Sequence, residues 1–309
     1  MSAAHVGLAL LVVVIWGVAF VATKLALESF SPPALAAVRF VVAAAPALVL
    51  ARPLVAWRSL VIVGTFLFTG QFLFQFFGIA RGVPAGLAAV VVQTQALFTI
   101  VLAALALGER PTPRQLAGTA VAVGGLAVIA GTVGDDLSAI GLALVTLSAV
   151  SWAVGNVLVK RLPPVDPLTL AAWLSLVPPV PALALALAHE GPGGLARVLA
   201  GASGLALAAA LYLGAVATVL GYAIWGFLLR RYPAPAVTPF ALLVPFVAAL
   251  GSALVFGERF GPVRLTGMAL VLAGLAVIVL PVGASDPARP ADPVRPADPV
   301  RPDKTAGRP

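Results

Sequence analysis

The chain has 309 residues, of which 61% are hydrophobic and only 10% are charged. A soluble domain carries roughly 25% charged residues, so this composition excludes a soluble enzyme, a nucleic-acid-binding protein and a disordered chain, and it predicts a membrane protein. The formal net charge of +8 is then typical of a basic cytoplasmic face and does not indicate a nucleic-acid surface.

Ten apolar stretches follow one another along the chain, and each is long enough to cross a bilayer as a helix of roughly 20 residues. In chain order they are Val6–Leu27, Pro33–Leu50, Ser59–Ile79, Pro84–Leu107, Arg114–Ala130, Leu137–Val159, Leu168–Ala188, Ser203–Leu229, Ala234–Phe256 and Val263–Leu280. The first stretch lacks the basic start of a signal peptide, so we expect it to remain as a helix. The sequence thus predicts an all-α integral membrane protein with ten transmembrane helices. Because the breaks between them are short, the function is expected inside the helix bundle.

Lysine and arginine predict the orientation, because they are enriched in cytoplasmic loops. If the N-terminus is cytoplasmic, thirteen of these residues lie on that side, five of them after the last span. The opposite side then holds four, which are Arg81, Arg197, Arg259 and Arg264. Both the N-terminus and the C-terminus are therefore predicted to be cytoplasmic.

The segment 282–309 differs from the rest of the chain because it repeats Asp-Pro-Ala-Arg-Pro and Asp-Pro-Val-Arg-Pro units. Proline at this density removes backbone donors and favours polyproline II. We interpret the segment as a disordered, solvated cytoplasmic tail with a weak attraction to anionic lipid. A docking motif for a partner is the alternative.

The sequence contains an internal repeat. Gly108-Glu109-Arg110 recurs as Gly257-Glu258-Arg259, and further matches share the same offset of 149 residues. Each half also has a tryptophan followed eight residues later by a lysine, namely Trp16 and Lys24, and Trp152 and Lys160. We therefore divide the chain into two five-helix repeats, 5–133 and 137–281. Because five is odd, the second repeat must be inverted in the membrane, which is typical of secondary transporters.

Several motifs resemble the EamA domains of the drug/metabolite transporter superfamily. They are Trp16-Gly-Val-Ala-Phe20 with Lys24, Pro33 with Arg39-Phe40, and the two Gly-Glu-Arg motifs. Others are similar to the bacterial O-acetylserine and cysteine exporters of that family, namely Pro84-Ala-Gly-Leu-Ala88, Gln93-Thr-Gln-Ala96, Ser151-Trp152 with Gly155-Asn156, and Ala217-Thr218 with Gly221-Tyr222. Ala96 stands where the wider family commonly has proline, and the exporter subgroup shares this departure. The resemblance implies two inverted five-helix repeats and export of small amino-acid metabolites of the cysteine and O-acetylserine class.

Polar side chains that interrupt the spans are the candidate substrate-binding residues, because polar groups in hydrocarbon are costly and usually face a partner or a wet cavity. They are Gln71, Gln75, Gln93, Gln95, Trp152, Asn156, Thr218, Tyr222 and Trp225. Carboxamides both donate and accept hydrogen bonds, which suits an α-amino and α-carboxylate pair. Aromatic faces hold an ammonium group or an apolar side chain. We predict a midplane pocket from these residues, with hydrogen bonding between helices or an aromatic interface belt as the alternatives.

Charged residues near helix ends have structural interpretations. Lys24 and Glu28 lie four residues apart and are expected to form an ion pair on one helix. We expect Arg39 to have a structural partner such as Glu28, and a substrate carboxylate is the alternative. Glu109 and Glu258 are interpreted as hinges at helix ends. Seams of small residues that favour helix packing occur at Gly118 and Gly125, and at Gly267 and Gly274.

The absences in the sequence restrict its chemistry. It has no phosphate-binding Gly-x-x-x-x-Gly-Lys-Ser/Thr loop, so ATP is not expected to drive it. Cysteine is absent and the only histidines are His5 and His189, so no disulfide, metal site or cofactor is expected. No carboxylate lies at mid-bilayer, which argues against proton coupling through a buried acid.

We predict a secondary transporter, and not an enzyme, that exports a small amino-acid metabolite across the bacterial plasma membrane by alternating access. Its expected partners are a small-molecule substrate and the lipid bilayer, with no nucleic acid. An importer or exchanger of another metabolite or drug is the alternative within transport. A membrane-embedded enzyme, a scaffold and a channel are the alternatives outside it. The sequence leaves the oligomeric state and the coupling ion open.

Overall fold

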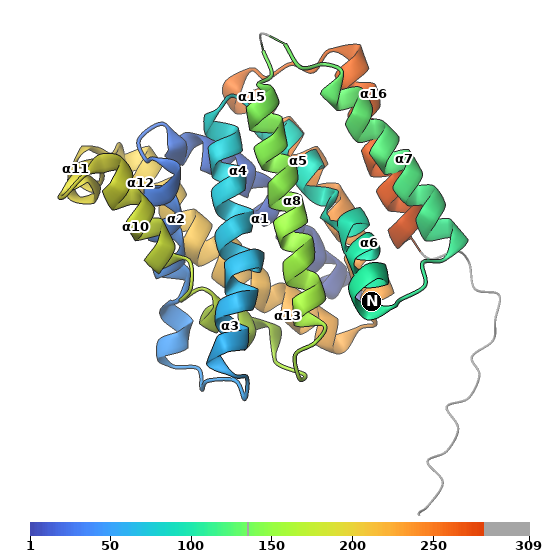
Figure 1. The fold of residues 1–309 in the computed structure, drawn as a ribbon, viewed down its shortest axis with the longest axis horizontal. Coiled ribbons are helices and arrows are strands. Elements are labelled where there is room, and N and C mark those ends of the chain that lie inside the picture. The colour runs from blue at the N-terminus through green and yellow to red at the C-terminus, as the bar shows by residue number, and fades with distance from the viewer. Residues whose placement is uncertain (135, 281–309) are drawn as a thin grey trace, which may run out of the picture.

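The computed structural model describes residues 1–134 and 136–280, and these residues form helices and no β-strand (Figure 1). The first half comprises α1 (Ala3–Leu27), α2 (Pro32–Ala43), η1 (Ala45–Leu48), α3 (Trp57–Gly64), η2 (Thr65–Gly70), α4 (Gln71–Ala80), α5 (Ala85–Gln93), α6 (Gln95–Leu107) and α7 (Pro113–Ala130). The second half comprises α8 (Ala139–Val159), α9 (Pro167–Leu174), α10 (Pro179–Glu190), α11 (Gly194–Gly201), α12 (Gly204–Leu211), η3 (Tyr212–Leu220), α13 (Gly221–Arg231), α14 (Ala234–Val237), η4 (Thr238–Leu243), α15 (Val244–Phe256) and α16 (Pro262–Val279). The predicted tail at 282–309 lies outside the described residues.

Within the described residues, nine helical stretches are long and apolar enough to cross a membrane. They are Ala3–Leu27, Trp57–Ala80, Ala85–Leu107, Pro113–Ala130, Ala139–Val159, Pro167–Glu190, Gly204–Arg231, Ala234–Phe256 and Pro262–Val279. Many large apolar side chains are exposed on these helices, Leu105 and Leu254 among them. Such a surface suits lipid and not water. The predicted all-α membrane fold is confirmed, and the chain is a multi-pass membrane protein.

The second predicted span, Pro33–Leu50, is shorter than a full crossing. The α-helix α2 ends at Ala43, and the 3₁₀ turn η1 continues it only to Leu48. Pro46 lies at this change, and a proline has no N–H to donate and clashes with the carbonyl four residues earlier. The part of the chain that the structure describes therefore holds nine long apolar stretches and one short one.

The two halves share their irregular helices as well as their sequence motifs. The third span of each half contains a π-helical segment, η2 in the first half and η3 in the second. The fourth span of each half is interrupted, by Thr94 between α5 and α6 and by the 3₁₀ segment η4 before α15. Irregular turns inside longer helices often mark functional hinges. These paired irregularities agree with the repeat that the sequence predicts.

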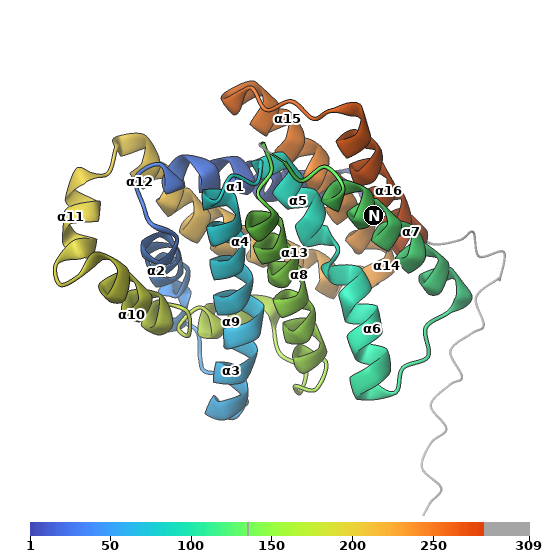
Figure 2. The same ribbon diagram turned by 45° about the horizontal axis from the view of Figure 1, so that its top comes forward.

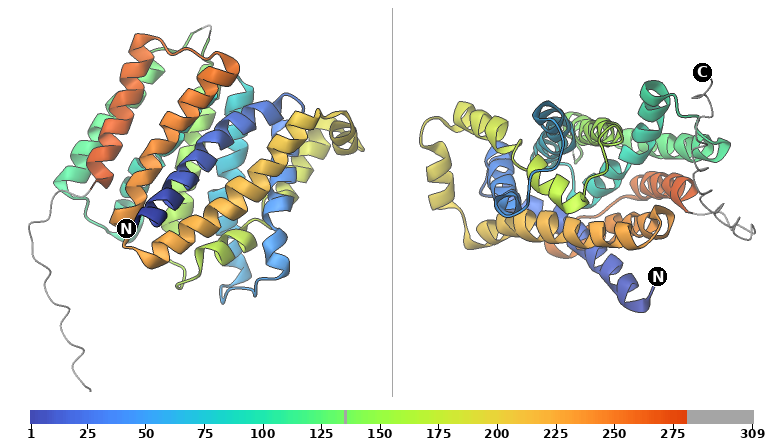
Figure 3. Two further views of the ribbon diagram at one scale, coloured as in Figure 1. Left: turned by 180° about the vertical axis from the view of Figure 1, so that it is seen from behind. Right: turned by 90° about the horizontal axis from the view of Figure 1, so that it is seen from below.

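The inverted arrangement places equivalent helix ends on opposite sides of the bundle (Figures 1 and 3). One side carries the start of α1 and the ends of α6 and α8, and we call it the N-side. The other carries the ends of α1 and α15, and we call it the far side. A residue near the end of a helix in one half thus has its counterpart across the bundle.

The helices α7 and α16 pack side by side along one edge of the bundle (Figures 1 and 2). A Cβ atom added to Gly118 would lie 2.6 Å from the carbonyl oxygen of Gly274. One added to Gly125 would lie 2.7 Å from the carbonyl oxygen of Gly267. Only glycine allows the two backbones to approach so closely. The glycine seams therefore serve helix packing, as predicted.

Candidate functional site

One polar cluster joins α6 and α8 inside the bundle. Asn156 donates a hydrogen bond from Nδ2 to Oε1 of Gln95 at 2.7 Å and another to Oγ1 of Thr99 at 3.3 Å. The hydroxyl of Thr99 in turn donates to the backbone carbonyl of Gln95 at 2.7 Å. All three side chains are half-buried. Two of the predicted residues, Gln95 and Asn156, thus share a network that a polar solute can join.

A cavity of about 90 Å³ leads from this cluster toward the N-side. Its lining includes Thr99 near the cluster, Ala103 and Gln115 along the way, and Glu109 and Lys160 at the helix ends. A cavity of this size holds several water molecules. Thr99 thus belongs to both the cluster and the cavity wall, so the cavity reaches one member of the cluster from the N-side.

The other three glutamines of the predicted site, Gln71, Gln75 and Gln93, bond to nearby protein groups. Gln93 donates from Nε2 to the backbone carbonyl of Ala241 at 2.8 Å, and so links the interrupted fourth spans of the two halves. Gln71 donates to Oε1 of Gln75 at 2.9 Å, and both side chains are only 3% exposed. The bond of Gln93 matches the alternative in which such residues hold helices together, whereas Gln71 and Gln75 bond to each other within the one helix α4. A role for the three glutamines in substrate binding stays a prediction.

The predicted aromatic residues of α13 surround Trp16 of α1. The ring centroid of Trp16 lies 5.9 Å from that of Tyr222 and 5.1 Å from that of Trp225. The indole N–H of Trp16 donates to the carbonyl of Ala217 at 3.0 Å. Its repeat counterpart, Trp152, packs between two apolar clusters. The sequence reasoning did not select Trp16 for the site, although the repeat pairs it with Trp152.

Arg39 of α2 lies at the contact between the two halves. Its side chain is 5% exposed, and Nη2 donates to the hydroxyl of Thr218 at 3.2 Å. The guanidinium carbon lies 3.9 Å from the ring centroid of Phe72. The prediction that Glu28 is its partner is wrong, because Glu28 is an exposed residue after the last turn of α1. The fold turns Arg39 inward against the second half and away from that helix end.

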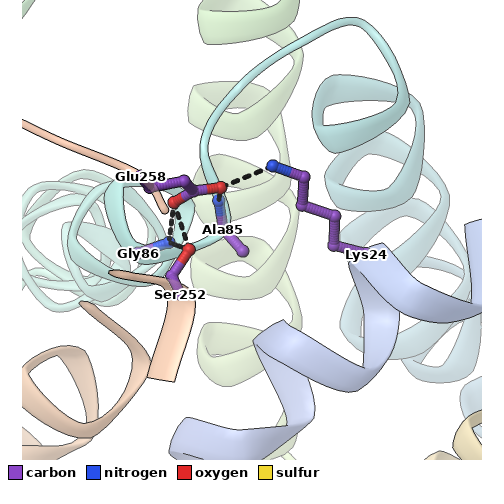
Figure 4. Close-up of polar contacts among 5 residues, drawn as sticks. All are labelled: Lys24, Ala85, Gly86, Ser252 and Glu258. Atoms are coloured by element: carbon purple, nitrogen blue, oxygen red, sulfur yellow. Dashed lines mark hydrogen bonds and ion pairs between the residues drawn. The ribbon is translucent and has the colours of Figure 1, made fainter. Parts of the chain in front are cut away.

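On the far side, Lys24 of α1 forms an ion pair with Glu258, which follows α15 (Figure 4). The ammonium nitrogen lies 2.6 Å from Oε1 of Glu258. The carboxylate also accepts hydrogen bonds from the backbone N–H groups of Ala85 at 3.0 Å and Gly86 at 3.4 Å, and from the hydroxyl of Ser252. Burial raises the pKa of Glu258, but the hydrogen bonds from Lys24, Ser252 and Ala85 outweigh it and hold the pKa below its ordinary value.

The ion pair predicted between Lys24 and Glu28 is therefore wrong. Spacing along one helix places Glu28 within reach of Lys24, but Glu28 is exposed to solvent. The fold brings Glu258 to a position where four donors stabilise its charge. Glu258 thus ties α1, α5 and α15 together, and its interpretation as a hinge stays a prediction.

The equivalent pair on the N-side is Lys160 and Glu109. The ammonium nitrogen of Lys160 lies 2.8 and 2.9 Å from the two carboxylate oxygens of Glu109. The two side chains are 44% and 50% exposed, compared with 34% and 8% for Lys24 and Glu258. The inverted repeats therefore form the same ion pair twice, once at each side, and only the far-side carboxylate is buried.

The structure brings the predicted site residues together only in part. Gln95 and Asn156 are bonded to each other, while Thr218 contacts Arg39. The sequence reasoning left Arg39 out of the site because a local carboxylate seemed to explain it. Within residues 1–134 and 136–280, no three His, Asp or Glu side chains gather in a way that could hold a metal ion.

Two segments, residues 4–131 and 139–280, match the family model described as the EamA-like transporter family. The chain belongs to this family. The first segment covers α1 to α7 and the second covers α8 to α16, so each half of the bundle is one EamA unit. The resemblance read from the sequence motifs is confirmed. Membership places the chain among transporters.

Several EamA relatives span nearly the whole chain. A probable amino-acid metabolite efflux pump of Salmonella typhimurium is 40% identical over 279 residues, which cover 88% of this chain and 93% of the relative. A protein of the same description from Escherichia coli is 38% identical with the same coverage. A probable terminal-alkyne amino-acid exporter of Streptantibioticus cattleyicolor is 31% identical and covers 87% of this chain and 91% of the relative.

A protein of known crystal structure has the same fold. It superimposes with a TM-score of 0.59, covers 90% of this chain and 97% of its own, and is 20% identical in sequence. At this identity the likeness concerns the arrangement of helices alone.

Proposed function

We propose that this EamA-family protein is an exporter of small amino-acid metabolites, of the cysteine and O-acetylserine class, in the bacterial plasma membrane. It works by alternating access, with the N-side in the cytoplasm. The observation that carries the proposal is the unequal burial of the two equivalent ion pairs, Lys24–Glu258 and Lys160–Glu109.

The inequality is informative because the two pairs occupy equivalent positions in inverted repeats. A symmetric rigid scaffold would hold both pairs in the same surroundings. Here the far-side pair is buried and ties three helices together, whereas the N-side pair is exposed beside the cavity. This is the arrangement expected of one state of an alternating-access transporter, closed at the far side and open at the N-side. Exchange of the two conformations between the halves produces the opposite state.

The substrate class is supported by the relatives and by the chemistry of the polar cluster. The relatives described above carry names of amino-acid metabolite efflux pumps and of an amino-acid exporter. Gln95 and Asn156 offer uncharged groups that both donate and accept hydrogen bonds, which suits a zwitterion. The motif likeness to O-acetylserine and cysteine exporters supports the finer assignment.

The charge distribution supports the orientation that export requires. The N-side carries most of the lysines and arginines of the short loops, so the positive-inside rule assigns it to the cytoplasm. A state open on that side accepts solute from the cytoplasm, as an exporter requires. The cavity between Thr99 and Lys160 is the entrance expected in this state.

The test is efflux from cells that overproduce cysteine precursors. Expression of the chain should raise cysteine and O-acetylserine in the medium several-fold over cells that carry an empty vector. Asn156→Leu, which replaces the carboxamide with an apolar side chain of similar size and so removes the link to Gln95, is the matched variant and should lower the efflux. Unchanged efflux despite verified membrane insertion would contradict the substrate assignment, and faster uptake in its place would indicate an importer.

A further inference from the structure

Arg39 is a buried cation that has no carboxylate partner among the described residues. Arg264 has the same exposed fraction as Arg39, 5%, but it donates two hydrogen bonds to Asp136, at 2.8 and 3.1 Å. Arg39 has one hydrogen bond, to Thr218, and the face of the Phe72 ring, while its Nε has no partner. A buried charge loses its hydration and is costly unless a counter-charge replaces it. The surroundings of Arg39 therefore lack an anion.

The position does not need an arginine for packing. The helices α2 and α9 occupy the same place in the two repeats, and each begins with a capping residue followed by proline, Ser31 and Asp166 respectively. Arg39 lies eight residues after Ser31, and the residue eight after Asp166 is Leu174, which is 1% exposed. The second half thus fills the equivalent position with a buried leucine. The positive charge is a property of the first half alone.

Arg39 also lies where the two repeats meet. A Cβ atom added to Gly214 would lie 2.7 Å from the carbonyl oxygen of Arg39, so α2 of one repeat and η3 of the other are in close contact. Thr218, which accepts the hydrogen bond from Arg39, belongs to the same π-helical segment and donates to the carbonyl of Leu213, five residues earlier. Irregular helices at the interface between inverted repeats form the solute sites of secondary transporters.

We propose that Arg39 binds the carboxylate of the transported amino-acid metabolite, an inference that rests on the proposed function. A guanidinium presents parallel N–H donors that match the two oxygens of a carboxylate. The unpartnered Nε of Arg39 lies on one such edge, and the bound carboxylate supplies the missing counter-charge. The rings of Phe40, Phe72 and Phe76 all lie within 5.9 Å of the guanidinium carbon and shield the pair from water. The site therefore binds solutes that carry a carboxylate more tightly than analogues in which the carboxylate is replaced by an amide or is missing.

The experiment compares ligands that differ only at the carboxylate. The rise in Tm of the purified full-length protein is measured against the concentrations of L-cysteine, L-cysteine amide and cysteamine, a readout that needs no transport. We expect the wild type to bind cysteine about 30-fold more tightly than either analogue, and Arg39→Leu to lose this preference. Arg39→Lys retains the positive charge but lacks the two parallel N–H donors of a guanidinium, so it should keep part of the preference for cysteine. Equal binding of the three ligands by the wild type, or an unchanged preference in Arg39→Leu, would overturn the proposal.

A second readout separates binding from a structural role. Without ligand, Arg39→Leu should have an equal or higher Tm than the wild type, because leucine removes a buried charge that lacks a counter-charge. The matched control is Arg264→Leu, which breaks the pair with Asp136 and should lower the Tm while leaving the cysteine preference intact. A fall in Tm for Arg39→Leu as large as that of the control would overturn the proposal. A wild type that neither binds nor exports any amino acid would overturn the proposed function itself.

Discussion

The two sides of the bundle hold the same ion pair in different surroundings. On the far side, the carboxylate of Glu258 accepts hydrogen bonds from Lys24, from a hydroxyl and from two backbone N–H groups. On the N-side, Glu109 accepts hydrogen bonds from Lys160 and is half exposed. Both repeats contain the lysine and the glutamate, but the groups that surround the glutamate differ between the two sides.

The sequence explains much of this difference. At the offset of 149 residues, Ser252 corresponds to Ala103, and Gly86 corresponds to Pro235. Alanine has no hydroxyl and proline has no N–H. Two of the four donors that surround Glu258 therefore have no counterpart for Glu109, even when the N-side closes. In the proposed alternating-access cycle we therefore expect far-side closure to be the stronger of the two, and the resting state to be open on the N-side.

Locking the far side in its closed state should have the largest effect. The chain has no cysteine, so Lys24→Cys with Glu258→Cys, and Lys160→Cys with Glu109→Cys, can be cross-linked selectively by a short bifunctional thiol reagent. The far-side cross-link should reduce transport in proteoliposomes to that of empty vesicles, because it holds the far side closed and so prevents one of the two states that the cycle needs. The N-side cross-link joins two residues that already form an ion pair in the state that is open on the N-side, so it should reduce transport less.

The controls for this experiment are the single-cysteine variants and the untreated double variants. The reagent should leave the transport rate of the single variants unchanged. Full transport by the cross-linked far-side pair would contradict alternating access between these states.

Neutralising the carboxylates should have a smaller and unequal effect. Glu258→Gln keeps the shape but leaves Lys24 without its counter-charge, and should weaken far-side closure by about 1–3 kcal/mol. Glu109→Gln breaks an exposed pair and should cost about 0–1 kcal/mol. Hydrogen exchange of the amides in α15 and in α6 measures the two effects. A larger effect for Glu109→Gln would reverse the ranking of the two sides.

Exchanging the hydroxyl between the two sides should have a further, smaller effect. Ser252→Ala removes one donor from Glu258 and should weaken far-side closure by about 1 kcal/mol, which is about a five-fold change in the equilibrium. Ala103→Ser offers Glu109 a hydroxyl and should slow the opening of the N-side by a similar factor. Both changes are measured by the same hydrogen exchange. If the amides of α15 exchange at the wild-type rate in Ser252→Ala, the hydroxyl does not explain the difference between the two sides.

The smallest expected effect is that of pH. The pKa of Glu258 is lowered in the closed state, so the stability it contributes is present above its ordinary pKa and is lost as the pH falls through the lower value. Far-side closure should therefore be constant between about pH 5 and about pH 8. Hydrogen exchange of α15, corrected for the intrinsic pH dependence of exchange, checks this. Loss of protection inside that window would mean that a group other than Glu258 controls closure.

The helices and their repeat could be predicted because their causes are local. A long apolar stretch must satisfy its backbone hydrogen bonds internally, and helices do so. The two Gly-Glu-Arg motifs revealed the repeat without any structure. The break after Ala43 was less evident, because a proline such as Pro46 can either kink a helix or end it.

The partners of the polar residues could be predicted only in part. Gln71 and Gln75 are four residues apart, so their shared face follows from helix geometry, but only the packing pairs them with each other. The same rule favoured Glu28 as the partner of Lys24, and the fold chose Glu258 instead. A rule about one helix cannot rank a local partner against one that lies 234 residues away in the chain.

By itself the sequence determined that this is a membrane protein of two inverted helical units and that it belongs with transporters, since composition and repeated motifs are properties of the chain. It also encodes the inequality of the two sides, in Ser252 against Ala103 and Gly86 against Pro235. Only the tertiary structure decided that Glu258 is buried with four donors, and that Arg39 faces the other repeat with no carboxylate partner among the residues described. The physical reason is that the stability of a buried charge depends on which groups surround it, and the folding of distant segments sets those neighbours.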